Sequence, residues 1–183
     1  MFRVWIVIAA ILATAAAARA QHAPASPYAG LETRPVKALS DQQIADLRAG
    51  RGMGLALSAE LNGYPGPLHV LELADRLGLT GAQRTRVQDI HAAMKAETVP
   101  LGESLIAQET ELDRQFATKS VTPASLQATT AAIGATQGAL RGAHLRYHLS
   151  TLEVLTPEQV HRYGELRGYR ASGGLGHGPE GHH

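Results

Sequence analysis

The sequence contains no cysteine, and aromatic residues make up only 4% of its 183 residues. Without cysteine the chain forms no disulfide, and it has no thiolate to serve as a nucleophile or as a soft metal ligand. A bound metal ion would therefore need imidazole, carboxylate, thioether or water as its ligands. The chain has nine histidines, which can supply imidazole ligands for such a site.

Neither sign of charge is in excess. The chain has 17 lysine and arginine residues against 16 aspartate and glutamate residues, and its formal net charge is +1. A nearly neutral chain has no electrostatic basis for binding nucleic acid or an anionic membrane. We therefore expect no nucleic-acid partner.

Catalytic motifs are also missing from the sequence. No serine lies in a Gly-x-Ser-x-Gly elbow, and the nearest approach to His-Glu-x-x-His, from His144 to His148, lacks the glutamate that would activate water. The glycine-rich stretch from Gly50 to Gly54 is not preceded by the strand that a phosphate-binding loop requires. We expect no enzyme activity and no organic cofactor.

Long apolar runs are confined to the amino terminus. Arg3 precedes an apolar run at residues 4–18, and Ala18-Arg19-Ala20 closes it as a small-x-small site. This pattern indicates a secretory signal peptide, residues 1–20, cleaved after Ala20. An uncleaved anchor is the alternative, although the run is short for a membrane span of about 20 residues. We expect the mature protein in the periplasm.

Proline and glycine divide the rest of the chain. We expect an extended arm at residues 21–39, a single helical domain at 40–168, and a disordered histidine- and glycine-rich tail at 169–183. Within the domain, capping residues and apolar spacings of three and four predict helices. Their expected ranges are 41–49, 55–61, 67–77, 81–117, 123–154 and 157–166. The predicted fold class is all-α, a long antiparallel helical hairpin with additional short helices.

The hairpin register brings histidines together. A short turn near Lys119 joins the two longest predicted helices, and the positions that then face each other place His91 within one turn of His148. If the helix predicted at 67–77 folds back on the hairpin, His69 comes level with His91, and His144 lies one turn farther along. Imidazoles from different helices favour a site for a divalent ion such as zinc, nickel, cobalt or copper. The predicted ligands are His69, His91, His144 and His148.

Structural roles for these residues stay open. Residues four apart on any helix share a face, so His144 and His148 could instead be members of a polar core. Met94 is expected to fill the core, and His161 is expected on the surface. The histidines of the tail would bind metal weakly, because ordering a flexible segment costs entropy.

Two copies of Leu-Thr-x-x-Gln carry a family resemblance. They are Leu79-Thr80-Gly81-Ala82-Gln83 and Leu155-Thr156-Pro157-Glu158-Gln159, and each opens a predicted helix with a threonine that can cap it. The motifs resemble the signature of the periplasmic Spy/CpxP family and its zinc- and nickel-responsive relatives, over roughly residues 66–168. The resemblance implies an antiparallel helical protomer that forms a homodimer.

The resemblance also implies two kinds of function. Nickel- and cobalt-sensing relatives draw ligands from a histidine pair before the first motif, an acidic residue in the next helix, and a His-x-x-x-Met pair before the second. This chain is similar in layout, but it has His69 with Glu72, then His91, then the pair His144 and His148. We therefore expect metal binding that changes how the 67–77 helix packs, in a sensing or resistance role, with a membrane-bound signalling protein as a further partner. The alternative is an ATP-independent chaperone for unfolded periplasmic proteins.

Overall fold

The computed structural model describes residues 26–169. The predicted signal peptide and residues 170–183 of the predicted tail lie outside the described residues. The chain divides into two units, residues 1–33 and residues 34–183. In the first, the described residues include a short 3-10 helix, η1 (Leu31–Thr33), and a hydrogen bond of 2.9 Å from Thr33 Oγ1 to the carbonyl oxygen of Gly30. All features below belong to the second unit.

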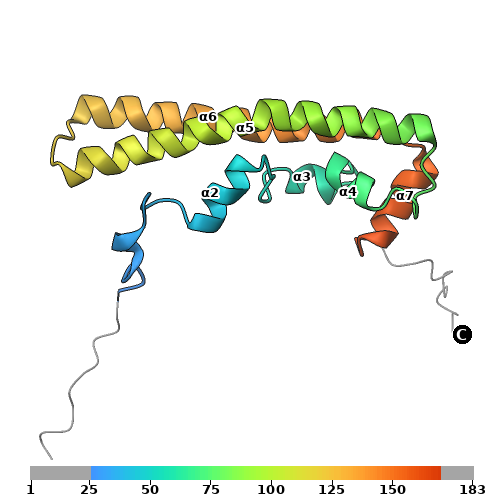
Figure 1. The fold of residues 1–183 in the computed structure, drawn as a ribbon, viewed down its shortest axis with the longest axis horizontal. Helices are drawn as coiled ribbons and strands as arrows, with labels where there is room; N and C mark the ends of the chain where they lie inside the picture. Colours follow the sequence, from blue (N-terminus) through green and yellow to red (C-terminus); the bar gives the residue numbers. More distant parts are fainter. Residues whose placement is uncertain (1–25, 170–183) are drawn as a thin grey trace, which may run out of the picture. The chain divides into compact units, whose positions relative to one another are not determined.

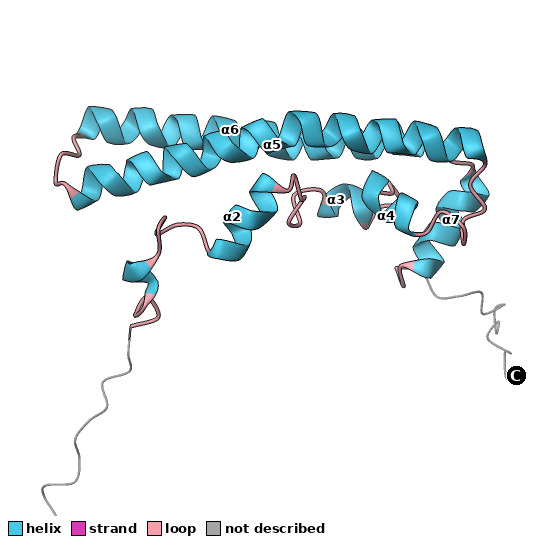
Figure 2. Ribbon diagram, in the orientation of Figure 1, coloured by secondary structure: helices cyan, strands magenta, loops and turns pink. Residues whose placement is uncertain are grey.

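Within residues 34–169 every regular element is a helix, which confirms the predicted fold class (Figure 2). No described helix is both long enough and apolar enough to cross a bilayer. The helices are α2 (Asp41–Arg48), α3 (Leu57–Glu60), α4 (Pro67–Glu72), α5 (Gly81–Ala117), α6 (Pro123–Leu152) and α7 (Pro157–Leu166).

Helices α5 and α6 form the antiparallel hairpin on which the other helices pack (Figure 1). Thr80 caps α5, and Thr122 caps α6 with Pro123 in its first turn. Lys119 takes a left-handed conformation in the turn between them, with φ of 54°. These local signals explain why the bounds of α5 agree with the predicted range.

Two apolar clusters hold the short helices against the hairpin. In one, α2 and the segment before it pack on the middle of α5 and α6, and Val36 and Leu39 are buried there although their positions belong to the predicted arm. In the other, α4 and α7 pack at the open end of the hairpin, where Val70 and Tyr163 are buried. The segment between these clusters runs along the hairpin (Figure 1) and borders the four predicted histidines.

The predicted end of the helix at 67–77 is wrong. Helix α4 ends at Glu72, and Leu73 leaves the helical conformation with φ of −103° and ψ of 10°. The chain continues in tight turns, with a hydrogen bond of 3.2 Å from the Ala74 amide to the Leu71 carbonyl. Because such turns keep a spacing of about three residues, Ala74 and Leu77 are still buried, and the apolar pattern alone could not place the boundary.

The two Leu-Thr-x-x-Gln motifs meet in space. Nε2 of Gln83 donates to Oε1 of Gln159 at 2.9 Å, and Nε2 of Gln159 lies 3.2 Å from Oε1 of Gln83. Each glutamine also accepts a hydrogen bond from the backbone amide of its own capping threonine, Thr80 or Thr156, at 3.0 Å. Each motif therefore caps its own helix and also links the starts of α5 and α7.

Gly102 of α5 lets α2 approach closely, and its replacement by alanine is expected to weaken this packing. A β-carbon at residue 102 would lie 2.7 Å from the carbonyl oxygen of Leu47. We expect Gly102→Ala to lower the free energy of unfolding by about 1–3 kcal/mol, as overpacking does. The matched control is Gly138→Ala in α6, where a β-carbon meets open space and should stabilise the helix by roughly 0.5–1 kcal/mol. Urea unfolding of both variants measures the difference, and equal stabilities would contradict the close contact.

Candidate metal centre

All four predicted histidines line one cavity, which we call the histidine cavity. It has a volume of about 570 Å³ and lies between the 49–53 loop, α4 and the hairpin. His69 comes from α4, His91 from α5, and the pair His144 and His148 from α6. The structure thus brings together side chains that are far apart in the sequence, and their binding of a metal stays a prediction.

His148 is held in a defined tautomer by the backbone. Its Nδ1 lies 2.7 Å from the carbonyl oxygen of Tyr64. Because a carbonyl oxygen only accepts, Nδ1 must donate the hydrogen, and in the neutral ring Nε2 keeps its lone pair. A β-carbon at residue 66 would lie 3.0 Å from Nε2 of His148, so glycine there leaves room for the ring. Metal-binding histidines are commonly oriented in this way, by a carbonyl group on the other ring nitrogen.

His144 is the most buried histidine of the site. Its side chain is only 2% exposed, and its Nε2 is buried without a hydrogen-bond partner. The ring packs near Gly52, where a β-carbon would lie 3.5 Å from Nδ1. A buried polar atom left unpaired costs about 1–3 kcal/mol, so this nitrogen is a candidate metal ligand.

His69 is paired with a carboxylate. Its Nδ1 lies 2.9 Å from Oε2 of Glu72, one turn later on the same helix. If Nδ1 donates to the carboxylate, Nε2 of the neutral ring is free to bind a metal. His69 and His148 therefore share one arrangement, in which Nδ1 is held by an oxygen and Nε2 remains available.

The donor groups are spread around the cavity rather than assembled. Among residues 26–169, no group of three or more histidine, aspartate and glutamate side chains is placed so that it could hold one metal ion. Zinc–nitrogen bonds are about 2.0–2.1 Å long, so shared ligation would require the side chains or α4 to move. The structure supplies the donors in one place but not a finished coordination sphere.

The stability of the metal-free protein is expected to fall on acidification. Burial lowers the pKa of His144, and the neighbouring His148 lowers it further; burial and then Lys95 lower the pKa of His91. The ordinary histidine pKa is about 6.5, so below this pH the unfolded chain binds more protons than the folded chain. The contribution of these residues is therefore fully present above about pH 6.5 and is lost as pH falls toward their folded pKa values.

Urea unfolding between about pH 7.5 and pH 5 measures this dependence. His144→Leu removes one of the two groups, so its stability should fall less steeply with acid than that of the unsubstituted protein. Parallel curves for the two proteins would contradict the lowered pKa of His144.

Glu60 is a central residue that the sequence analysis did not identify. It is 7% exposed, and it accepts hydrogen bonds from Tyr163 Oη, from Tyr169 Oη at 3.1 Å and from the Gly66 amide at 3.1 Å. Its Oε2 also lies 3.7 Å from Nδ1 of His148. Burial, and next the hydrogen bond to Glu60, raise the pKa of Tyr163. Glu60 thus connects the histidine cavity to α7.

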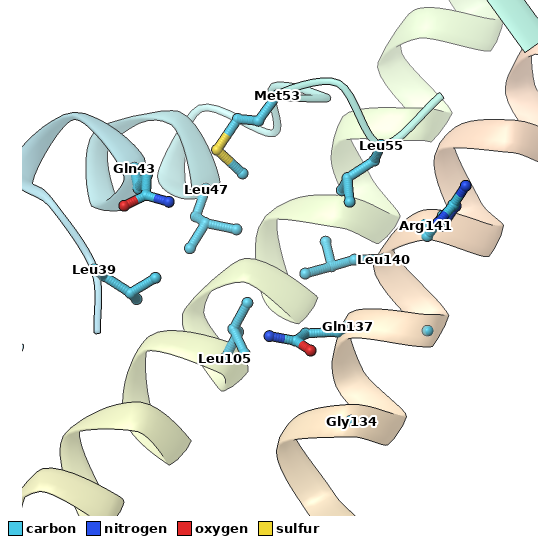
Figure 3. Close-up of a pocket in the computed structure, with 11 residues that line it drawn as sticks. Leu39, Gln43, Leu47, Met53, Leu55, Leu105, Gly134, Gln137, Leu140 and Arg141 are labelled. Atoms are coloured by element: carbon cyan, nitrogen blue, oxygen red, sulfur yellow. The ribbon is translucent and has the colours of Figure 1, made fainter. Parts of the chain in front are cut away.

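A second cavity lies beside the first and has a different character (Figure 3). Its volume is about 480 Å³, and its lining includes Leu47, Leu105 and Leu140. No histidine, aspartate or glutamate lines it, although Arg141 and Met53 do. The imidazoles and carboxylates that could bind a metal therefore gather in the histidine cavity and not in its apolar neighbour.

Comparison with known proteins covers the part of the chain that carries the site. A family model described as heavy-metal resistance matches residues 63–162. The matched segment contains the four cavity histidines and both Leu-Thr-x-x-Gln motifs. No curated protein and no solved structure matches the chain.

Proposed function

Because the chain belongs to the heavy-metal resistance family, we propose that it binds a transition-metal ion in the histidine cavity, in metal sensing or resistance. The observation that carries the proposal is the convergence of four histidines on one cavity, with Nε2 of His144 buried and unpartnered. Imidazoles with one carboxylate, Glu72, in the cavity lining suit zinc, nickel, cobalt or copper. Calcium and magnesium prefer oxygen ligands and fit this lining poorly.

In this proposal the ion links elements that are separate in the chain. His144 and His148 would bind it from α6, His91 from α5, and His69 from α4. The Tyr64 carbonyl and Glu72 keep two of these rings in the required orientation. Because the ion binds only the folded arrangement, its binding free energy would stabilise the packing of α4 on the hairpin.

Calorimetric titration with zinc, nickel, cobalt and copper tests this function. The titrated protein carries the substitutions His177→Ala, His182→Ala and His183→Ala, so that these terminal histidines do not contribute to metal binding. We expect one ion for each chain, and the same stoichiometry in His161→Ala, because His161 lies outside the histidine cavity. Failure of all four ions to bind in a fixed ratio would contradict the proposal.

We propose further that the protein is exported to the periplasm and acts there without catalysis, as a homodimer. The amino-terminal pattern supports export, and the missing catalytic motifs support a binding role. The Leu-Thr-x-x-Gln motifs support a place near the Spy/CpxP proteins and their zinc- and nickel-responsive relatives. A membrane-bound signalling protein would be the partner in a sensing role.

A chaperone function is the second candidate, and exposed leucines favour it. Leu57 and Leu61 of the α3 region are 53% and 58% exposed, and Leu149 of α6 is 51% exposed. Apolar side chains of this kind can contact unfolded clients. An aggregation-suppression assay on an unfolded protein separates the two candidates. Strong suppression without stoichiometric metal binding would favour the chaperone.

A further inference from the structure

Met94 lies among the histidines rather than in the apolar core. It is 6% exposed, it belongs to neither of the two apolar clusters, and it lines the histidine cavity. On α5 it follows His91 by one helical turn. Core filling, the role expected from the sequence, does not explain why a buried methionine borders four imidazoles. Its thioether sulfur is a soft metal ligand.

The lining residues of the cavity carry more positive than negative charge. Arg51 and Lys95 border it, whereas Glu72 is the single carboxylate among its lining residues. Arg51 is paired with Asp46 at 2.9 Å, but Asp46 itself does not line the cavity. Because Coulomb energies scale with ionic charge, an excess of positive charge in the lining opposes a divalent ion about twice as strongly as a monovalent ion. Glu60, 3.7 Å from His148, offsets part of this excess.

We infer that the preferred ion of the histidine cavity is monovalent copper, Cu(I), bound by Sδ of Met94 together with Nε2 of His144 and of His148. Thioether and imidazole are neutral donors, and thioether ligands select Cu(I). Zinc is bound by cysteine, histidine and carboxylate, so Met94 adds nothing to a zinc site. This inference rests on the proposed function, because it names the ion for the same cavity. Ag(I), which has the same charge and similar softness, serves as an air-stable probe.

The Met94→Leu variant tests the assignment, because leucine keeps the apolar volume and removes the sulfur. Affinities for Cu(I) are measured without oxygen against a competing chelator, and those for Zn(II) and Ni(II) in parallel titrations. The full chain is used, with alanine at the three terminal histidines. We expect Cu(I) affinity to fall on the order of tenfold or more, with Zn(II) affinity unchanged.

Met53→Leu is the matched control. Met53 borders both cavities, but it is 43% exposed and its side chain extends toward Leu47, into the apolar cavity (Figure 3). The same substitution there should leave Cu(I) affinity unchanged. Nuclear magnetic resonance of the methionine methyl groups gives a direct readout, in which Ag(I) shifts the Met94 methyl signal and leaves the Met53 signal in place.

The possible contrary results distinguish failure of the Cu(I) assignment from failure of the proposed metal-binding function. Unchanged Cu(I) affinity in Met94→Leu, while the unsubstituted protein still binds zinc or nickel, would overturn the choice of ion and leave the proposed function standing. Equal losses for Cu(I), Zn(II) and Ni(II), or an equal loss in Met53→Leu, would also overturn it, since neither is specific to the Met94 sulfur. Absence of binding of every ion to the unsubstituted protein would end both proposals.

Discussion

The His144→Leu protein is expected to lose metal affinity by on the order of a hundredfold or more while its metal-free form becomes no less stable. His144 lines the cavity and carries a buried nitrogen, so its removal takes away one proposed ligand. The same nitrogen has no hydrogen-bond partner, and an unpaired buried polar atom costs about 1–3 kcal/mol. Leucine removes this cost and keeps an apolar side chain of similar size.

Two measurements on the same variant separate ligation from a structural role. Competition titration gives the metal affinity, and urea unfolding without metal at about pH 7.5 gives the stability. His161→Leu serves as the control, because this histidine is exposed on α7 and should change neither quantity. A destabilised His144→Leu protein with unchanged metal affinity would show that His144 is a member of a polar core, the alternative that the sequence left open.

The Glu60→Ala protein is expected to be destabilised by about 3–5 kcal/mol, the cost of breaking a buried polar network. Alanine would leave Tyr163 Oη, Tyr169 Oη and the Gly66 amide without their acceptor. It would also remove the carboxylate beside Arg167, which lies 3.5 Å from Glu60. The free energy of unfolding of a domain of this size is only about 5–15 kcal/mol, so the expected loss is a large fraction of it.

Two further variants test whether the hydrogen-bond network around Glu60 causes this loss of stability. Tyr163→Phe deletes one hydrogen bond of the network, and we expect a smaller loss of about 1–2 kcal/mol. Glu72→Ala is the matched control, since Glu72 is a half-exposed carboxylate, and a surface pair of this kind contributes about 0–1 kcal/mol. In thermal and urea unfolding, the loss of stability should therefore be largest for Glu60→Ala, smaller for Tyr163→Phe and smallest for Glu72→Ala. A loss for Glu60→Ala no larger than that for Glu72→Ala would show that the network is not stabilising.

The helices of the hairpin could be predicted because their ends carry strong local signals. Thr80 and Gln83 form a capping box, and Thr122 with Pro123 marks the next helix. The carboxyl end of α4 has no comparable signal, because an apolar spacing of three also fits the tight turns that follow Leu73. Helix boundaries that depend on packing rather than on caps therefore cannot be placed from the apolar pattern alone.

The gathering of the histidines could be predicted for a similar reason. In a hairpin with a short turn, the turn fixes which residues face each other, so His91 and His148 had to lie at one level. Glu60 could not be identified in this way, since its partners Tyr163 and Tyr169 follow it by more than one hundred positions in the chain. A glutamate on a short helix carries no local sign of burial, and only the docking of α7 creates its environment.

The paired glutamines of the two motifs have a consequence for how the protein opens. Gln83 and Gln159 are 76 residues apart, yet neither side chain can leave its place without releasing the other. The first turns of α5 and α7 should therefore belong to one cooperative unit in hydrogen exchange, although one begins the hairpin and the other follows it. Local unfolding of the first turn of either helix should therefore expose the amides in the first turn of the other helix as well.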